Sequence, residues 1–458
     1  MGLTKAIEHV FRRYLPSPFT IAVLLTILTI VLAFIFTENT SDKNHLAVIL
    51  SHWENGIWNN GLLVFAYQMM LILVLGHVLV LSRPMERLIL GITKFVNNTS
   101  NAALLVALPT MLVSFFNWGL GLIFGAILAR KVGEYAQANN IPINYPLIGA
   151  SGYVGLMVWH GGISGSAPIK VSEAGHLKSL LEGISNVDLL EQLPETISTS
   201  LTVFSHWNLV LFVVVALSIA ITVYYLGKRV SPGNVDLKEY KFKSVEKENL
   251  VGAERLDYSK IAATCFGALI LVAFLLQYLP ALKALNITPN MLNFFMLGLA
   301  IILHGSFKSF LVAVEEAIGD TAGILIQFPL YFGIMGIMGG SGMINDISDF
   351  FVSISTTTTL PIFTFLSAGL VNIFVPSGGG QWAVQGPLVL ESAMQLGVPL
   401  PKAVMALAYG DQVTNMLQPF WALPLLGITK LKAKEILPYT LIFMLIGSLV
   451  YISGLLIL

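Results

Sequence analysis

Four short segments of this chain place glycines beside polar side chains within otherwise apolar stretches. They are Asn117–Gly121 (NWGLG), His160–Pro168 (HGGISGSAP), Pro376–Gln381 (PSGGGQ) and Asp411–Pro419 (DQVTNMLQP). Glycine lets a ligand approach the main chain, and hydroxyl and amide side chains hydrogen-bond small ligands. Small residues also let helices pack closely, but four such segments together favour a binding site.

The candidate substrate ligands come from these segments and from one asparagine just before the third. They are Asn117, Trp118, Gly119, His160, Ser164, Ser166, Asn372, Ser377, Gly378, Gly379, Gly380, Gln381, Thr414, Asn415 and Gln418. Lys and Arg are nearly absent from the apolar stretches. Helix N-termini that follow the glycines would therefore have to bind a substrate anion.

Asp411 is the sharpest candidate for the residue that binds a coupling ion. A carboxylate this deep in an apolar segment is rare and usually functional. Asn117 and Asn372 are further candidates for the coupling ion. Carbonyl and side-chain oxygens at such helix breaks suit a hard cation, so sodium is the candidate metal near these three side chains.

Three other patterns do not qualify as sites. Gly162–Ser166 ends in serine where the GxSxG motif of hydrolases needs glycine. The Pro376–Gly380 run lacks the Gly-Lys-Ser/Thr of a phosphate-binding loop. His77, His160 and His304 share no metal-ligand spacing. We therefore expect no enzyme, no ATP-driven transport and no cofactor apart from bound sodium.

The composition shows what surrounds these segments. Of 458 residues, 55% are hydrophobic and only 11% are charged, against roughly 25% charged in soluble domains. The 25 basic residues balance 25 acidic ones, so no basic excess exists to bind nucleic acid. A single cysteine, Cys265, excludes an internal disulfide and is expected to be a small buried side chain. The chain is predicted to be an all-α polytopic membrane protein.

Apolar runs of about 20 residues indicate about nine full spans. They cover residues 19–36, 60–81, 145–168, 208–227, 261–279, 291–303, 320–340, 402–427 and 436–458, with hairpins near 102–128 and 361–391. Before the first span, residues 1–16 predict an interfacial amphipathic helix.

Lys and Arg positions predict the sidedness of these spans. Arg12 and Arg13 hold the N-terminus in the cytoplasm, and the basic turn Lys430–Lys434 leaves the C-terminus outside. Basic residues precede and follow residues 102–128, at Arg87 and Arg130 among others. A re-entrant hairpin fits this pattern better than a single crossing.

The order of parts is the same in both halves of the chain. Each half has a span with a glutamine (Gln68, Gln327), a broken hairpin (Asn117, Asn372) and an interrupted span. We expect a first repeat over 17–227, a cytoplasmic linker over 228–260, a connecting span over 261–279 and a second repeat over 280–458. The unpaired connecting span makes the second repeat inverted, as in secondary transporters.

Longer motifs resemble a known family. NIFVPSGGGQWAVQGP at 372–387, ALAYGDQVTNMLQPFWALP at 406–424, FFNWGLGLIFGA at 115–126 and GILIQFPLY at 323–331 are similar to the bacterial short-chain fatty acid transporters. The resemblance implies uptake of small monocarboxylates such as acetoacetate or butyrate. A more remote similarity to sodium-coupled di- and tricarboxylate carriers of the ion transporter superfamily implies a homodimeric elevator.

These observations predict a symporter of short-chain carboxylates in the bacterial inner membrane. The coupling ion is a proton or sodium, and the lipid bilayer and a second copy of the chain are the expected partners. A carrier of another small anion, such as a dicarboxylate, is the near alternative. An ion channel or an intramembrane hydrolase are alternatives from other classes, separable by counterflow and by hydrolysis assays.

Overall fold

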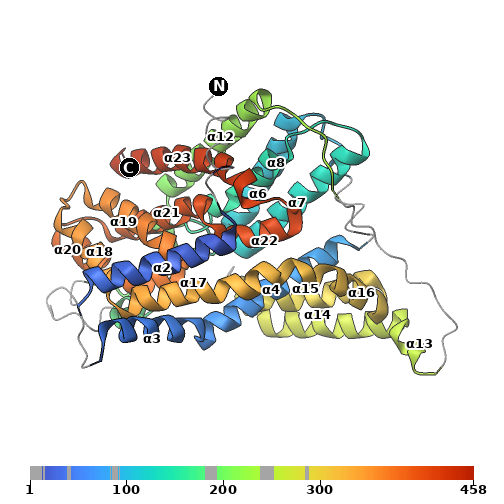
Figure 1. Ribbon diagram of the computed structural model, residues 1–458, viewed down its shortest axis with the longest axis horizontal. Helices are drawn as coiled ribbons and strands as arrows, with labels where there is room; N and C mark the ends of the chain where they lie inside the picture. The colour runs from blue at the N-terminus through green and yellow to red at the C-terminus, as the bar shows by residue number, and fades with distance from the viewer. Residues whose placement is uncertain are drawn as a thin grey trace.

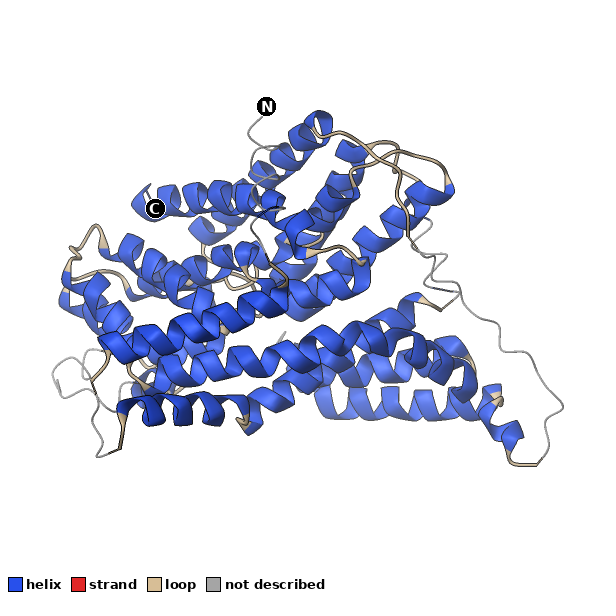
Figure 2. Cartoon of the chain, viewed as in Figure 1, coloured by secondary structure: helices blue, strands red, loops and turns tan. Residues whose placement is uncertain are grey.

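A computed structural model describes residues 13, 16–38, 43–82, 84, 91, 93–180, 193–237, 252–283 and 288–457. This part of the chain is helical, apart from one isolated antiparallel bridge between Ile143 and Gly233 (Figure 2). The interfacial helix expected over 1–16, except residues 13 and 16, lies outside the described residues. The middle of the expected linker, residues 238–251, lies outside them too.

The helices before residue 238 form the first half. They are α2 (Pro18–Phe36), α3 (His45–Ile57), α4 (Asn60–Val80), α6 (Thr99–Phe116), α7 (Trp118–Ala138), α8 (Tyr145–Ser151), η1 (Val154–Met157), α9 (Ser166–Lys170), α10 (His176–Leu180), η2 (Thr199–Leu201) and α12 (His206–Arg229). Polar residues start many of them. Asn98, for example, accepts a hydrogen bond from the Asn101 amide at 2.9 Å and so caps α6.

The helices after residue 251 form the second half. It contains α13 (Glu254–Asp257), α14 (Lys260–Lys283), α15 (Pro289–His304), α16 (Phe307–Ala317), η3 (Ile318–Thr321), α17 (Ala322–Gly340), α18 (Met343–Ser353), α19 (Leu360–Phe374), α20 (Gly378–Gln395), α21 (Leu400–Thr414), η4 (Asn415–Leu417), α22 (Pro419–Thr429) and α23 (Ala433–Ile457).

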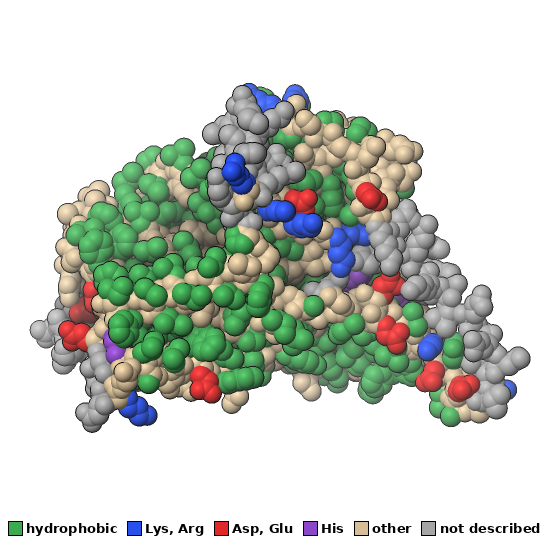
Figure 3. Space-filling model, viewed as in Figure 1, with side chains coloured by type: hydrophobic (Ala, Val, Ile, Leu, Met, Phe, Trp, Pro, Cys, Tyr) green, Lys and Arg blue, Asp and Glu red, His purple; other side chains and the backbone are tan. Residues whose placement is uncertain are grey.

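The surface of the long helices is strongly apolar. Seven helices of the described chain are long and apolar enough to cross a membrane, or eight if α15 and α16, bent by 120°, form one span. On α14, Leu276 is 78% exposed and Leu269 is 63% exposed. A face of this kind is costly in water and stable against lipid. Figure 3 shows it as a nearly continuous apolar surface. The chain is a multi-pass membrane protein.

Two pairs of helices form hairpins whose ends meet. α6 packs against α7, and the Asn144 amide beyond α7 donates to Thr99 Oγ1 at the start of α6, at 3.0 Å. α19 packs against α20, and Thr357 Oγ1 before α19 donates to the carbonyl of Leu396 after α20, at 3.0 Å. Figure 1 shows α7 and α8 toward one end of the long helices and α19 and α20 toward the other.

Two central helices hold the halves together. α17 packs against α2 and α3, while α4 packs against α15 and α16. The α3–α17 contact is close because a Cβ added at Gly56 would lie 2.3 Å from the Phe332 carbonyl oxygen. α22 packs against α7. The breaks of both halves therefore meet in the interior.

Several helix boundaries differ from those expected. The break in the first hairpin is Asn117 alone, because its side chain caps α7 and makes Trp118 to Gly121 helical. The second arm runs to Ala138 instead of 128. Residues 145–168 form no single helix, since α8 ends at Ser151 and η1 and turns follow. Residues 402–427 divide into α21 and α22.

Two residues lie in surroundings other than those expected. Arg130 is 2% exposed within α7, and its Nε donates to Glu134 Oε1 at 2.8 Å, so it is not a free flanking charge. Cys265 is exposed, because only 17% of the α14 window is buried and most of its side chains face outward. The expectation that Cys265 is buried was wrong.

Candidate functional site

Asp411 and His160 form a buried pair at the centre of the protein. Asp411 comes from the last turn of α21 and His160 from the turn after η1, and they are 1% and 0% exposed. His160 Nε2 accepts a hydrogen bond from the Ala167 amide at 3.0 Å. The imidazole proton therefore sits on Nδ1 and is donated to Asp411 Oδ2. The hydrogen bond between them joins the broken segment of the first half to that of the second.

A hydrogen-bonded network fixes the main chain on either side of His160. Gln412 Oε1 accepts from the His160 and Gly161 amides, both at 2.9 Å. Asn208 Nδ2 donates to the Gly161 carbonyl at 2.9 Å, and Tyr409 Oη donates to Asn208 Oδ1 at 2.6 Å. The imidazole position is thus set by α21 and α12 as well as by its own segment.

Asn372 connects the second hairpin to the break between α21 and α22. Three acceptors surround its Nδ2: the Asp411 carbonyl at 2.7 Å, Asn415 Oδ1 at 2.8 Å and Thr414 Oγ1 at 3.0 Å. The side-chain amide of Gln418 donates to the Asn372 carbonyl. The last turn of α19 is therefore held directly beside the Asp411 backbone.

The tip of the second hairpin lies against His160. Ser377 caps α20 by accepting from the Gly380 amide at 3.2 Å. A Cβ at Gly378 would lie 2.8 Å from His160 Cε1 and 2.8 Å from the Trp159 ring. A Cβ at Gly379 would lie 3.7 Å from Ser166 Oγ, an ordinary contact. Only Gly378 is thus required for the tip to approach the imidazole.

The tip of the first hairpin meets the same turn from the other side. The Trp118 amide donates to Ser164 Oγ at 2.9 Å, and Asn117 Oδ1 accepts from the Leu120 amide at 2.9 Å. The Trp118 ring lies between Trp159 and Trp421, with ring centroids 6.0 and 5.2 Å away. Ser164 and Asn117 therefore have protein partners that align the first tip.

Several buried polar atoms around Asp411 have no partner in the described chain. The oxygens are Asp411 Oδ1, Asn372 Oδ1 and Gln418 Oε1, and the nitrogens are Gln412 Nε2 and Asn415 Nδ2. Each such group costs about 1–3 kcal/mol when left unpaired. Unpaired oxygens of this kind fit a proton or a sodium ion, and the described residues contain no group of three His, Cys, Asp or Glu side chains for another metal.

Contacts connect most of the sequence-predicted residues, with differences in detail. His160, Asp411, Asn372, Thr414, Asn415 and Gln418 form one network, and Gly378, Gly379, Ser166, Ser164 and Trp118 surround it. Gly119 lies in the first turn of α7 and Gly380 in that of α20. Gln381 instead donates to Ala368 and Gln385 within the hairpin.

Sequence reasoning missed four residues of the site. Gln412 is the next residue after Asp411 in the polar motif, and this position could have marked it. Trp159 stacks on His160, with the ring centroids 4.5 Å apart. Tyr153 Oη donates to the carbonyls of Asn415 and Gln418 at 2.9 and 3.1 Å. Asn208, which bonds Gly161, and Tyr153 carry no pattern that would have marked them.

Comparison with known proteins decides the family. The family described as short chain fatty acid transporter matches residues 2–458. The chain belongs to the short-chain fatty acid transporter family. A protein of Escherichia coli strain K12, assigned by name to short-chain fatty acid transport, is 36% identical over 457 residues, covering 97% of this chain and 96% of the relative. A Haemophilus influenzae protein of the same name is 33% identical over 453 residues, with the same two coverages of 97% and 96%.

Two solved structures show a weaker likeness. The Alcanivorax borkumensis YdaH transporter has a TM-score of 0.42 at 16% identity and covers 96% of this chain and 98% of its own. Neisseria gonorrhoeae MtrF, from a class of antimetabolite efflux pumps, has a TM-score of 0.41 at 13% identity, with coverages of 98% and 97%. TM-scores this low establish neither a shared fold nor a shared function.

Proposed function

We propose that this chain carries small monocarboxylates such as butyrate or acetoacetate across the bacterial inner membrane, by symport with a proton or sodium. The observation that carries the proposal is the meeting of four helix breaks around one buried acid. Among the buried side chains of the described residues, Asp411 is the one carboxylate, and the one Lys or Arg is Arg130, which is bonded to Glu134. A substrate carboxylate thus has helix N-termini, and no basic side chain, to bind it.

The charge of Asp411 supplies the coupling. Two like charges about 4 Å apart repel by roughly 4 kcal/mol at an effective dielectric of about 20. A substrate anion and an ionised Asp411 therefore need a cation between them, or a proton on the acid. Asp411 Oδ1 is the atom that accepts it, because Oδ2 is bonded to His160 and Oδ1 has no partner in the described chain.

The arrangement of the hairpins supports alternating access by inverted repeats. α6 with α7 and α19 with α20 each have their two ends together, at opposite ends of the long helices (Figure 1). We further propose that each hairpin, with the broken helix that follows it, belongs to a unit that moves as an elevator within a homodimer. The N-terminus lies in the cytoplasm and the C-terminus outside.

Removing the charge at Asp411 tests the proposed function. Asp411→Asn should lose gradient-driven butyrate accumulation in proteoliposomes while keeping part of butyrate counterflow, since the hairpin tips that bind the anion remain. Asp346→Asn, an exposed acid on α18, is the matched control and should transport normally. Sodium and pH gradients imposed separately identify the coupling ion. Full accumulation by Asp411→Asn would remove this residue from the coupling mechanism.

Competing acids test the substrate class. Unlabelled monocarboxylates should inhibit butyrate uptake more strongly than dicarboxylates of equal length. A dicarboxylate that competes better and is itself accumulated would favour the carrier of another small anion with the same fold.

A further inference from the structure

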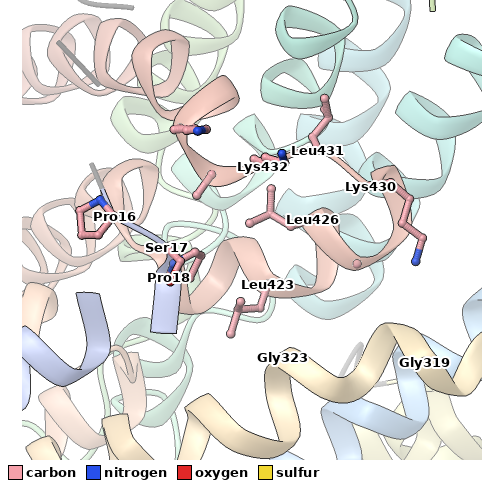
Figure 4. A pocket seen from close by; sticks show the side chains of 13 residues that line it. Pro16, Ser17, Pro18, Gly319, Gly323, Leu423, Leu426, Lys430, Leu431 and Lys432 are labelled. Atoms are coloured by element: carbon pink, nitrogen blue, oxygen red, sulfur yellow. The ribbon is translucent and has the colours of Figure 1, made fainter. Parts of the chain in front are cut away.

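A second cavity lies away from the Asp411 site, where four helix ends meet. It measures about 450 Å³, is open on one side, and is lined by residues near the starts of α2, α17 and α23 and at the end of α22. Figure 4 shows Ser17 and Pro18 on one wall, Gly319 and Gly323 opposite, and the lysine-bearing turn between α22 and α23 above them. Nothing in the proposed transport cycle uses this space.

The cavity is strongly basic. Lys430, Lys432 and Lys434 all line it, and none of the ion pairs found in the described chain involves Lys432 or Lys434. The acid next in sequence, Glu435, has its carboxylate on the Lys432 main-chain amide at 2.7 Å and is not among the lining residues. Figure 3 shows basic side chains gathered near the start of α2 beside α22, with a few acidic side chains close to them, on a face that is otherwise mostly apolar.

Helix dipoles add to this positive potential. α2 and α23 contain 19 and 25 residues, and both begin in the cavity wall. The first amides of a helix lack intrahelical partners, and a helix start attracts an anion. The lysines and the helix starts therefore attract the same kind of ligand.

The wall toward the bilayer is apolar. Phe19, two residues after Ser17, is 46% exposed, and only 22% of the α2 window is buried. Leu423 and Leu426 of α22 line the cavity below the lysines. An occupant thus meets positive charge at one end and hydrocarbon at the other. The lysine turn also lies on the side that the positive-inside rule assigns to the cytoplasm, where the leaflet is rich in anionic lipid.

We propose that this cavity binds the phosphate headgroup of an anionic phospholipid. The lysines and helix starts hold the phosphate, and the acyl chains follow the exposed face of α2. A free butyrate ion shares the negative charge but not the length of hydrocarbon that this face accommodates. The lipid would join α2 of the first half to α17, α22 and α23 of the second.

Lipid retention tests this site directly. The purified protein, in detergent containing equal amounts of phosphatidylglycerol and phosphatidylcholine, should retain phosphatidylglycerol preferentially in native mass spectra. Replacing Lys430, Lys432 and Lys434 by Gln should reduce that retention at least tenfold. The matched control replaces three exposed lysines elsewhere, Lys260, Lys283 and Lys308, by Gln. This control should leave the retention of phosphatidylglycerol unchanged.

A steric variant fills the cavity without changing its charge, and a size-exclusion measurement checks that the variant is folded. Gly319 lines the cavity and has nothing within 4 Å of its Cβ position, so Gly319→Phe fits the backbone while occupying the space. It should also abolish preferential retention, with an unchanged elution volume on size exclusion. Equal retention of both lipids by the unmodified protein, or displacement of phosphatidylglycerol by saturating butyrate, would overturn the proposal. The second result would make the cavity a substrate vestibule.

Discussion

At the scale of single residues, the site is defined by how His160 holds its proton. The Ala167 amide donates to Nε2, so the imidazole donates through Nδ1 to Asp411 Oδ2. In the proposed transport cycle, Asp411 is therefore the residue whose charge varies. His160 bonds Oδ2 of that carboxylate, which leaves Oδ1 for the proposed coupling ion.

The two hydrogen bonds of the His160 imidazole predict that two substitutions lower activity to different extents. His160→Phe removes the donor to Asp411, and a hydrogen bond to a charged group is worth about 1.5–3 kcal/mol. We expect at least a tenfold fall in gradient-driven uptake. His160→Asn places an amide N–H near the former Nδ1 and should retain more activity. Equal loss in both variants, measured in proteoliposomes beside counterflow, would show that ring packing on Trp159 matters and the donor does not.

Gly378 and Gly379 provide a matched pair of substitutions. Both lie in the first turn of α20, so Val changes helix propensity equally at each. Val at 378 overlaps the His160 and Trp159 rings, and overpacking of this kind costs about 1–3 kcal/mol. Butyrate accumulation should fall about tenfold or more. Val at 379 meets only Ser166 and should stay within about threefold of the parent. Similar losses from both would mean that the tip does not need to approach His160.

At the scale of helices, the composition predicts the membrane spans well. It predicts the positions of the helix breaks only in part. A bilayer requires about 20 apolar residues, so the runs that became α2, α4, α12, α14, α17 and α23 stand out in the sequence. The position of a break within a polar segment depends on which side chain caps the next helix. Asn117 and Ser377 do so here, and local sequence does not choose between them and their polar neighbours.

The contact between α10 and α20 is expected to depend on pH. The Trp382 indole of α20 donates to His176 Nε2 at 3.0 Å, and His176 lies in α10, which is not one of the membrane-spanning helices. Burial chiefly, and then the Lys170 ammonium, lower the pKa of His176 below its ordinary 6.5, against an opposing effect of Glu173. The lowered pKa means that neutral His176 stabilises the contact, fully above pH 6.5 and progressively less as pH falls below it.

A cysteine in α10 measures this loss. Leu177 is 0% exposed, so Leu177→Cys in a Cys265→Ser background should react slowly with a thiosulfonate reagent at pH 7.5 and faster at pH 5.5. Lys178→Cys, the exposed neighbour, corrects for the reagent's own pH dependence. Adding Trp382→Phe should make the rate fast at both pH values. A corrected rate independent of pH would contradict the proposed role of His176.

At the scale of the whole molecule, the arrangement depends on contacts that sequence distance conceals. His160 and Asp411 are 251 positions apart, and Asn372 and Asp411 are 39 apart. The sequence marks each segment as unusual but contains no pairing rule that joins them. The similar order of spans, hairpins and breaks in the two halves is what suggested that the four breaks form one site. The Tyr153 and Asn208 contacts, which depend on side-chain packing between halves, remained outside it.

Opposite orientation of the two hairpins is the remaining prediction, and it belongs to the whole molecule. Asn97 and Asn139 are exposed at the two ends of the first hairpin, as are Thr358 and Gln395 at the ends of the second. Single cysteines at these positions, in a Cys265→Ser background, should divide into two classes. The first pair should react with an impermeant maleimide only from the cytoplasmic side, and the second pair only from outside.

The physical reason is that a chain entering the bilayer and turning back must expose both ends of its hairpin to the same aqueous phase. Inverted repeats place the two hairpins in opposite phases. A split within one pair would turn that hairpin into an ordinary crossing. Labelling of all four positions from one side would make the repeats parallel, and alternating access through two opposed hairpins would no longer follow.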